Sequence, residues 1–174
     1  FSRLTIVGRI VTSDDYDWDE VRQGQNLAVD MNPAAIAFPE SADDISKVIG
    51  FAREAGLKVT GQSTGHGSPA LPPLAETILI KTDRMRDVSI ESGTRTARVA
   101  AGVRAPELGM EAIKQGLSFL PGTSPTVGVT GYTLGGGLGW LGRKHGFACN
   151  HVRAFEVVTA DGKLRQVDSK TNPD

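Results

Sequence analysis

A single histidine in a glycine-bearing stretch is the first candidate for chemistry. His66 lies between Gly65 and Gly67 in VTGQSTGHGSPALPPL, residues 59–74, after a short β-branched run and before several prolines. Glycines let a backbone approach a ligand closely, and a neutral imidazole nitrogen is a nucleophile. The pattern is compatible with a loop that holds an ionisable ring against a bound group. From the residues alone, however, a loop histidine satisfied by a local hydrogen bond is the favoured interpretation.

A second segment, between residues 122 and 146, holds nine of the 21 glycines. Their companions are Val, Thr, Leu, Tyr and Trp, whereas flexible linkers combine glycine with serine. The chain has 19 basic and 20 acidic residues, so it has no excess of Lys and Arg to neutralise a pyrophosphate. Backbone N–H groups would have to bind that charge instead, and they can approach it only where side chains are absent. Tight turns and close packing explain these glycines equally well.

The sequence GLGWLG, residues 137–142, matches the dinucleotide pattern G-x-G-x-x-G, and Asp161 follows about 20 residues later. That motif needs a buried strand leading directly into its first glycine. Here TVGVTGYTLGG precedes it, and Asp161 falls in an expected hairpin turn. Nicotinamide binding is therefore retained only as a minor alternative.

Strands and helices that position these segments follow from the hydrophobic pattern. A helix is predicted at 40–56, capped by Ser41 and ended by Gly56, and another at 105–116. Residues 1–32 read as an irregular or short-helical arm. Strands are predicted at 34–39, 57–60, 77–82, 87–92 and 96–102, and a hairpin within 152–169. The fold class is α+β.

Composition limits the function classes. No apolar run approaches a membrane span, and no basic stripe is interleaved with aromatic residues, so neither a membrane nor a nucleic acid is an expected partner. Cys149 is the single cysteine, which excludes an intrachain disulfide and fits a cytoplasmic location. We expect Cys149 to be a buried, inert thiol. Trp18 and Trp140 are expected to be packing residues, although Trp140 is close enough to the glycine cluster in sequence to touch a ligand bound there. His145 and His151 lack the spacing of a metal site.

Long stretches of the chain resemble the FAD-linked oxidases of the vanillyl-alcohol oxidase and berberine bridge enzyme type. KVTGQSTGHGSPA looks like their histidine loop, and LPGTSPTVGVTGYTLGGGLGWLGRKHGFACNHVRAFEVVTADGKL resembles their second flavin-binding segment. NPAAIAFPESADDISKVIGFAREAGLKV matches the usual run before the first loop. The likeness covers about residues 28–168 in order.

This resemblance implies a PCMH-type FAD-binding domain made of two α+β subdomains with FAD between them. The expected boundaries are an N-terminal arm at 1–32 and the domain at 33–174, with subdomains at about 33–82 and 83–174. A C-terminal substrate domain, absent from this chain, supplies most of the substrate pocket in that family. The implied reaction moves a hydride from an alcohol, a sugar or a secondary metabolite to FAD, with O2 as the expected final acceptor.

Site residues are carried over from the family position by position. The histidine matching His66 bonds covalently to the flavin ring in the berberine bridge branch. Doubly tethered members have a cysteine where this chain has Ser124, so we expect attachment through His66 only. Many relatives have arginine in place of Gln62, so the pyrophosphate charge would have to be balanced elsewhere. Arg143 and Lys144 are candidates for this role, although both are more readily interpreted as exposed surface cations. The predicted cofactor contacts are Gln62, Ser63, Thr64, Gly65, His66, Gly67, Ser68, Pro125, Val127, Gly128, Val129, Gly131, Gly135, Gly136, Gly139 and Val158.

The family's general base comes from the substrate domain, so no catalytic residue is assigned to this chain. A different class of protein remains open beside the oxidoreductase. It is a binding module that keeps the fold but holds no flavin, or holds a nucleotide for regulation.

Overall fold

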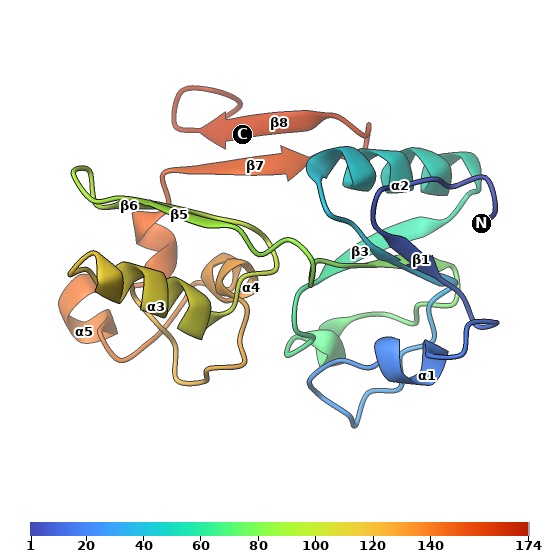
Figure 1. Ribbon diagram of the computed structural model, residues 1–174, viewed down its shortest axis with the longest axis horizontal. Coiled ribbons are helices and arrows are strands. Elements are labelled where there is room, and N and C mark those ends of the chain that lie inside the picture. The colour runs from blue at the N-terminus through green and yellow to red at the C-terminus, as the bar shows by residue number, and fades with distance from the viewer. Residues whose placement is uncertain (174) are drawn as a thin grey trace. The chain divides into compact units, whose positions relative to one another are not determined.

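A four-stranded sheet forms the centre of the first of two compact units. The computed structural model describes residues 1–173, and the first unit comprises Phe1–Arg84 together with the segment that starts at Arg153. The strand order is β1 (Arg9–Val11), β2 (Ala35–Phe38), β4 (Thr77–Lys81) and β3 (Lys58–Gln62) (Figure 1). The strands β2, β4 and β3 are parallel, and β1 is antiparallel to β2 at the edge.

Helix α2 (Ala42–Glu54) joins β2 to β3 as the sequence predicts. The Ser41 hydroxyl accepts a hydrogen bond from the Asp44 N–H at 3.2 Å, and Gly56 follows the helix with φ +70°. Val48 and Ala52, four residues apart, are buried in one cluster with Ile78 of β4. The β-α-β unit predicted from capping and periodicity is therefore confirmed.

The side chain of Asp44 organises the start of the first unit. Its carboxylate is fully buried and accepts hydrogen bonds from the backbone N–H groups of Val7 (2.9 Å), Gly8 (3.1 Å) and Glu40 (3.0 Å). Burial raises the pKa of Asp44, but these backbone donors and the charge of Lys47 outweigh it and leave the pKa below its ordinary value. The N-terminal residues are thus held to the beginning of α2.

The expected N-terminal arm is an integral part of this unit. Residues 9–11 form β1, which pairs with β2, and α1 (Trp18–Val21) follows. Val11 is fully buried with Ile36 and Leu79, and Trp18 packs against this cluster. The short helix was anticipated, but the strand was not, because three residues give too little alternation to be recognised.

The second unit, Met85–Val152, contains a hairpin and several short helices. Strands β5 (Val88–Glu91) and β6 (Thr96–Val99) are antiparallel, and α3 (Ala105–Lys114) packs against β5. Glu107 accepts a hydrogen bond from the Arg104 backbone N–H, which caps α3. The glycine-rich segment forms α4 (Val129–Leu134) and α5 (Gly142–His145), and the 3₁₀ turn η2 (Ala148–His151) follows it.

The C-terminal hairpin, β7 (Ala154–Val158) and β8 (Leu164–Asp168), belongs to the first unit. Both strands pack against α2, whereas the expected boundaries grouped residues 153–174 with the second subdomain. The observed division differs because this packing joins segments at least 100 positions apart in sequence, which sequence order alone does not reveal. Within residues 1–173, no helix has the length and apolar character needed to cross a bilayer.

Candidate functional site

The predicted histidine loop connects β3 to the 3₁₀ turn η1 (Ser68–Ala70) in the first unit. The chain reverses at Gly65, which is buried and has φ +81°. The Gly65 carbonyl accepts a hydrogen bond from the Ser68 N–H at 3.1 Å, and the Gly67 carbonyl accepts one from the Ala70 N–H at 3.1 Å. His66 is exposed. This loop therefore presents the imidazole outward from a tight, glycine-dependent turn.

Two buried polar side chains flank this turn. Gln62 is 7% exposed and Ser68 is 2% exposed. The Gln62 Nε2 and Oε1 atoms and the Ser68 Oγ atom have no hydrogen-bond partner among residues 1–173. A buried polar atom without a partner costs about 1–3 kcal/mol, so these three atoms call for a partner other than residues 1–173, such as a water, an ion or a ligand. The residues present here fit a polar group such as the phosphates of a nucleotide cofactor.

The other residues of this loop that were predicted to contact the cofactor are Ser63, Thr64 and Gly67. Ser63 and Thr64 are half-buried, and Gly67 is exposed with open space where a Cβ would be. The Thr64 carbonyl accepts a hydrogen bond from the Gln25 N–H at 2.8 Å. Sequence reasoning missed this partner, and the only signal for it was the Gly24 that precedes Gln25.

Glycines of the second segment have two different environments. Gly131 and Gly136 (φ +101°) face open space, and a Cβ on Gly135 would make only ordinary contacts. By contrast, a Cβ on Gly139 would lie 1.8 Å from the Pro121 carbonyl oxygen, and one on Gly137 would lie 2.5 Å from the Ala148 Cβ. The absence of a side chain at Gly139 is therefore explained by packing within the unit.

Tyr132 is the centre of that packing. A Cβ on Gly122 would meet its ring at 2.9 Å, and one on Gly139 would lie 2.8 Å from its hydroxyl. The hydroxyl oxygen is buried without a hydrogen-bond partner among residues 1–173, and burial raises the pKa of Tyr132. The tyrosine thus occupies the space that these glycines leave.

The stretch before α4 uses much of its backbone inside its own unit. The Val127 carbonyl accepts a hydrogen bond from the Ala105 N–H at 3.1 Å, and the Val129 N–H donates to the Val103 carbonyl at 2.9 Å. Gly128 forms a β-bridge with Arg104. These bonds fix the start of α4, in which Gly131 faces open space.

Pro125 lines a shallow apolar hollow of about 300 Å³ that also involves Ser124, Phe119 and Pro106. The Ser124 and Thr126 hydroxyls are 3.0 Å apart and share a hydrogen bond. Val158, the last predicted contact, ends β7 in the first unit and pairs with Leu164.

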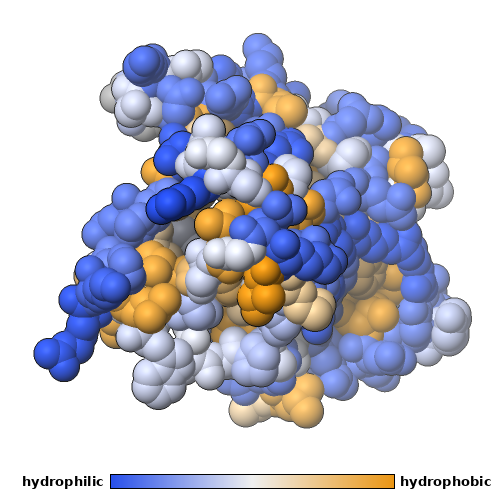
Figure 2. Space-filling view, turned by 60° about the vertical axis from the view of Figure 1, so that its left-hand side comes forward, coloured by the Kyte–Doolittle hydropathy of each residue, from blue (hydrophilic) through white to orange (hydrophobic). Residues whose placement is uncertain are grey.

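Two expectations about side chains in the second unit were wrong. Trp140 is 78% exposed and is therefore not a packing residue. Cys149 is exposed as well, with its thiol 3.5 Å from the Asn150 side-chain oxygen. Arg143 and Lys144 are exposed in α5, as surface cations are. Figure 2 shows the apolar side chains on one face as small groups among polar ones.

Among residues 1–173, no group of three or more His, Cys, Asp or Glu side chains is placed to hold a metal ion. His151 Nε2 instead lies 2.9 Å from the His145 carbonyl oxygen.

Comparison with known proteins gives consistent matches. The family described as FAD binding domain matches residues 33–168. Glucooligosaccharide oxidase of Sarocladium strictum is 34% identical over 164 residues, which cover 92% of this chain and 33% of that protein. (R)-6-hydroxynicotine oxidase of Paenarthrobacter nicotinovorans is 30% identical over 174 residues, which cover 98% of this chain and 37% of that protein.

Solved structures match over nearly the whole chain. 6-Hydroxy-D-nicotine oxidase from Arthrobacter nicotinovorans has a TM-score of 0.89 at 30% identity. The match covers 98% of this chain and 38% of the oxidase chain. Glucooligosaccharide oxidase from Acremonium strictum has a TM-score of 0.87 at 32% identity, and the match covers 95% of this chain and 35% of the oxidase chain. That structure is described with 6-S-cysteinyl, 8α-N1-histidyl FAD. The α+β fold is thereby confirmed, and the chain spans between 33% and 38% of these relatives.

Proposed function

The chain belongs to the FAD-binding domain family of FAD-linked oxidoreductases, and from this premise we propose that it is the flavin-binding part of an oxidase. The enzyme would transfer a hydride from an alcohol, a sugar or a secondary metabolite to FAD, and O2 would take up the electrons. The relatives named above are oxidases of a sugar oligomer and of a nicotine derivative, which supports this range of substrates. When bound, FAD supplies the hydride acceptor.

The observation that carries this proposal is the polar environment of the His66 turn. Gln62 and Ser68 bury three polar atoms that have no partner among residues 1–173, and His66 between them is exposed. Phosphate oxygens would accept hydrogen bonds from the Gln62 amide and the Ser68 hydroxyl. We propose that the other residues named above as predicted cofactor contacts also bind FAD.

His66 is proposed as the covalent attachment point. The new bond joins an imidazole nitrogen to a methyl carbon of the flavin ring. The imidazole N–H and methyl C–H bonds that would break release two protons and two electrons in total, and molecular oxygen would take these up as hydrogen peroxide. The chain's own part is to hold a neutral imidazole against that carbon.

We infer a single tether because Ser124 lacks a thiol and its hydroxyl already bonds to Thr126. A serine oxygen is a far poorer nucleophile than a thiolate near neutral pH.

The substrate pocket and its general base are assigned to the substrate domain, because the chain spans about a third of the relatives it matches. The isolated chain is therefore expected to be inactive. A cytoplasmic location is proposed only from the single cysteine.

The test is a visible absorption spectrum of the full-length protein before and after acid precipitation, with His66→Ala in parallel. Yellow colour that stays in the wild-type pellet and leaves the mutant pellet supports both flavin binding and the His66 tether. Colour that leaves both pellets would show flavin binding without the tether. A protein that stays colourless after reconstitution with FAD would instead favour the flavin-free binding module.

A further inference from the structure

We propose that residues 18–31, which precede the family match at 33–168, form a brace that positions the His66 loop, and that Lys81 is the residue holding this brace in place. The inference rests on the proposed function, in which His66 attaches the flavin. It assigns a role to a segment that the flavin-binding motifs do not include.

The brace touches the loop at a crossing of two glycines. A Cβ on Gly65 would lie 2.8 Å from the Gly24 Cα, and a Cβ on Gly24 would lie 3.2 Å from the Gly65 Cα. Beside this crossing, the Gln25 N–H donates to the Thr64 carbonyl at 2.8 Å. Backbone thus lies directly on backbone, one residue before His66.

Lys81 joins this brace to the strands that carry the loop. It is 8% exposed, ends β4, and lies opposite Gln62, the last residue of β3. Its Nζ donates to the Val21 carbonyl at 2.8 Å and to the Gln23 carbonyl at 2.9 Å. A charged amine bonded to two carbonyls is a strong contact in a buried place. One side chain therefore fixes the residues immediately before Gly24 to the strand pair from which the loop departs.

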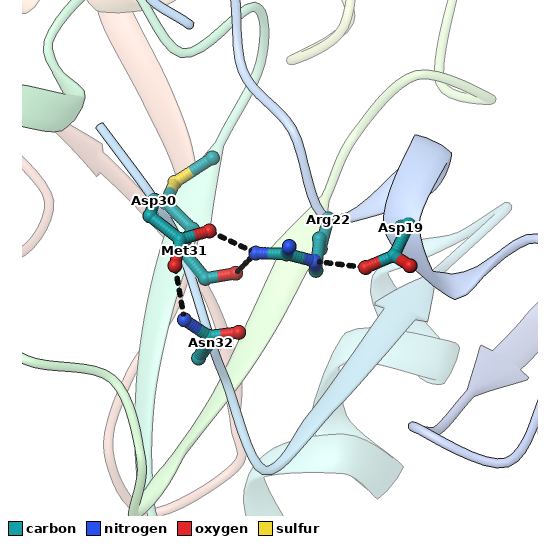
Figure 3. A network of polar contacts seen from close by, with 5 residues as sticks. All are labelled: Asp19, Arg22, Asp30, Met31 and Asn32. Carbon is teal, nitrogen blue, oxygen red and sulfur yellow. Dashed lines mark hydrogen bonds and ion pairs between the residues drawn. The ribbon is translucent and has the colours of Figure 1, made fainter. Parts of the chain in front are cut away.

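The far end of the brace is closed by Arg22 (Figure 3). Its Nε donates to Asp19 at 2.9 Å, and its Nη1 pairs with Asp30 and donates to the Met31 carbonyl at 3.0 Å. Met31 is 3% exposed, and its Cε would lie 3.1 Å from a Cβ on Gly24. Arg22 thus links the two ends of residues 22–31, and the Met31 side chain lies against Gly24.

Placement of this kind matters because bond formation depends steeply on geometry. A misplacement of about 1 Å from a distant change can slow a reaction about 100-fold. The brace holds Thr64 and Gly65, the two residues before His66, and therefore acts on the imidazole without touching the cofactor.

The first variant is Lys81→Met in the full-length protein, incubated as apoprotein with saturating FAD. The rate of covalent attachment, read as flavin fluorescence of the denatured protein, should fall about 10- to 100-fold. The affinity for FAD, measured in a His66→Ala background, should change much less. Lys81→Arg keeps the charge and should recover part of the rate. Lys47→Met is the matched control, because Lys47 is an exposed lysine paired with Asp43 on α2.

A second variant changes no charge. In Gly24→Ala the new methyl group presses on the Gly65 backbone, which must shift by a few tenths of an ångström, so attachment should again slow. Its control is Gly50→Ala, where a Cβ meets nothing within 4 Å. If Lys81→Met does not fold, Gly24→Ala and Lys81→Arg decide the question.

Wild-type attachment rates in both folded Lys81→Met and Gly24→Ala would overturn the inference. If the wild-type protein carries no covalent flavin, the tether proposed above fails, and amide hydrogen exchange of residues 62–68 decides the role of the brace. Faster exchange there in Lys81→Met than in Lys47→Met would support the brace, and equal exchange would overturn it.

Discussion

The two glycine-bearing segments look alike in sequence and differ in structure. In the loop of residues 62–68, Gly65 meets another backbone at Gly24, and the neighbouring Gln62 and Ser68 bury polar atoms without partners among residues 1–173. In the segment of residues 122–146, several glycines instead surround one tyrosine ring. Glycine therefore accompanies a turn with buried, unpaired polar atoms in the first unit, and three glycines of the second segment, Gly122, Gly137 and Gly139, lie against the tyrosine ring or hydroxyl. What each glycine faces distinguishes the two roles, and glycine content does not.

The largest expected effect tests the packing role of Gly139. A Cβ there would lie 1.8 Å from the Pro121 carbonyl oxygen, so Gly139→Ala should lower the free energy of unfolding by about 3 kcal/mol or more. Urea denaturation of the apoprotein measures this loss. Gly135→Ala, with ordinary contacts only, is the control. Equal losses in the two variants would remove the distinction between packing and open glycines.

Gly65→Ala tests the backbone crossing in the first unit. The positive φ costs an L-residue about 1–2 kcal/mol, and the Cβ would also lie 2.8 Å from the Gly24 Cα. We expect a loss of about 2–3 kcal/mol in the free energy of unfolding, together with weaker FAD binding. Thermal unfolding of the apoprotein and flavin titration measure the two effects. Unchanged stability would show that residues 24 and 65 are not in close contact.

Gln62→Leu should separate stability from binding. Replacing a buried amide that lacks partners with an apolar group of similar size should raise the apoprotein's free energy of unfolding by about 1 kcal/mol. Affinity for FAD should fall about tenfold in titrations, because a hydrogen bond to a charged group is lost. The control Gln115→Leu changes an exposed amide whose oxygen accepts a surface hydrogen bond from the Ser92 hydroxyl; it should not raise the free energy of unfolding and should leave the affinity for FAD unchanged. A less stable apoprotein would indicate that Gln62 has a structural partner.

The smallest expected effect on stability belongs to Gly131→Ala. Nothing lies within 4 Å of the added Cβ, and alanine favours a helix such as α4, so the free energy of unfolding should stay within about 1 kcal/mol of the wild-type value. Weaker FAD binding in a titration would then show that the open face of Gly131 meets the cofactor. Unchanged binding would assign this glycine to neither role.

Local features of the fold were predictable because they depend on neighbouring residues. The Ser41 cap, the Gly56 stop and the Asp161–Gly162 turn each act within a few positions of the chain, and the elements around them form as expected. Helices α4 and α5 were missed because they have only six and four residues, too few for a helical periodicity, and because α4 consists largely of glycine, threonine and valine, which are poor helix formers.

The histidine loop was recognised from its sequence, but its supports were not. Contacts of Lys81 with Val21 and Gln23 span about 60 positions, and no periodicity links such distant residues. The exposure of Trp140 and Cys149 could not be predicted either, because burial depends on which surfaces the tertiary structure brings together. The cofactor contacts in both units remain predictions until flavin binding is measured.

The first unit is built from two stretches of chain separated by the whole second unit, and this sets an order of assembly during synthesis. The brace, the His66 loop and all four sheet strands are complete once Arg84 has left the ribosome. Strands β7 and β8 follow only after residues 85–152, a delay of seconds at the usual elongation rate. During that interval the surface of α2 that receives the hairpin is uncovered. A nascent chain arrested before Arg153 should therefore carry a formed histidine loop while the part of α2 that later packs against β7 and β8 is still open to chaperones.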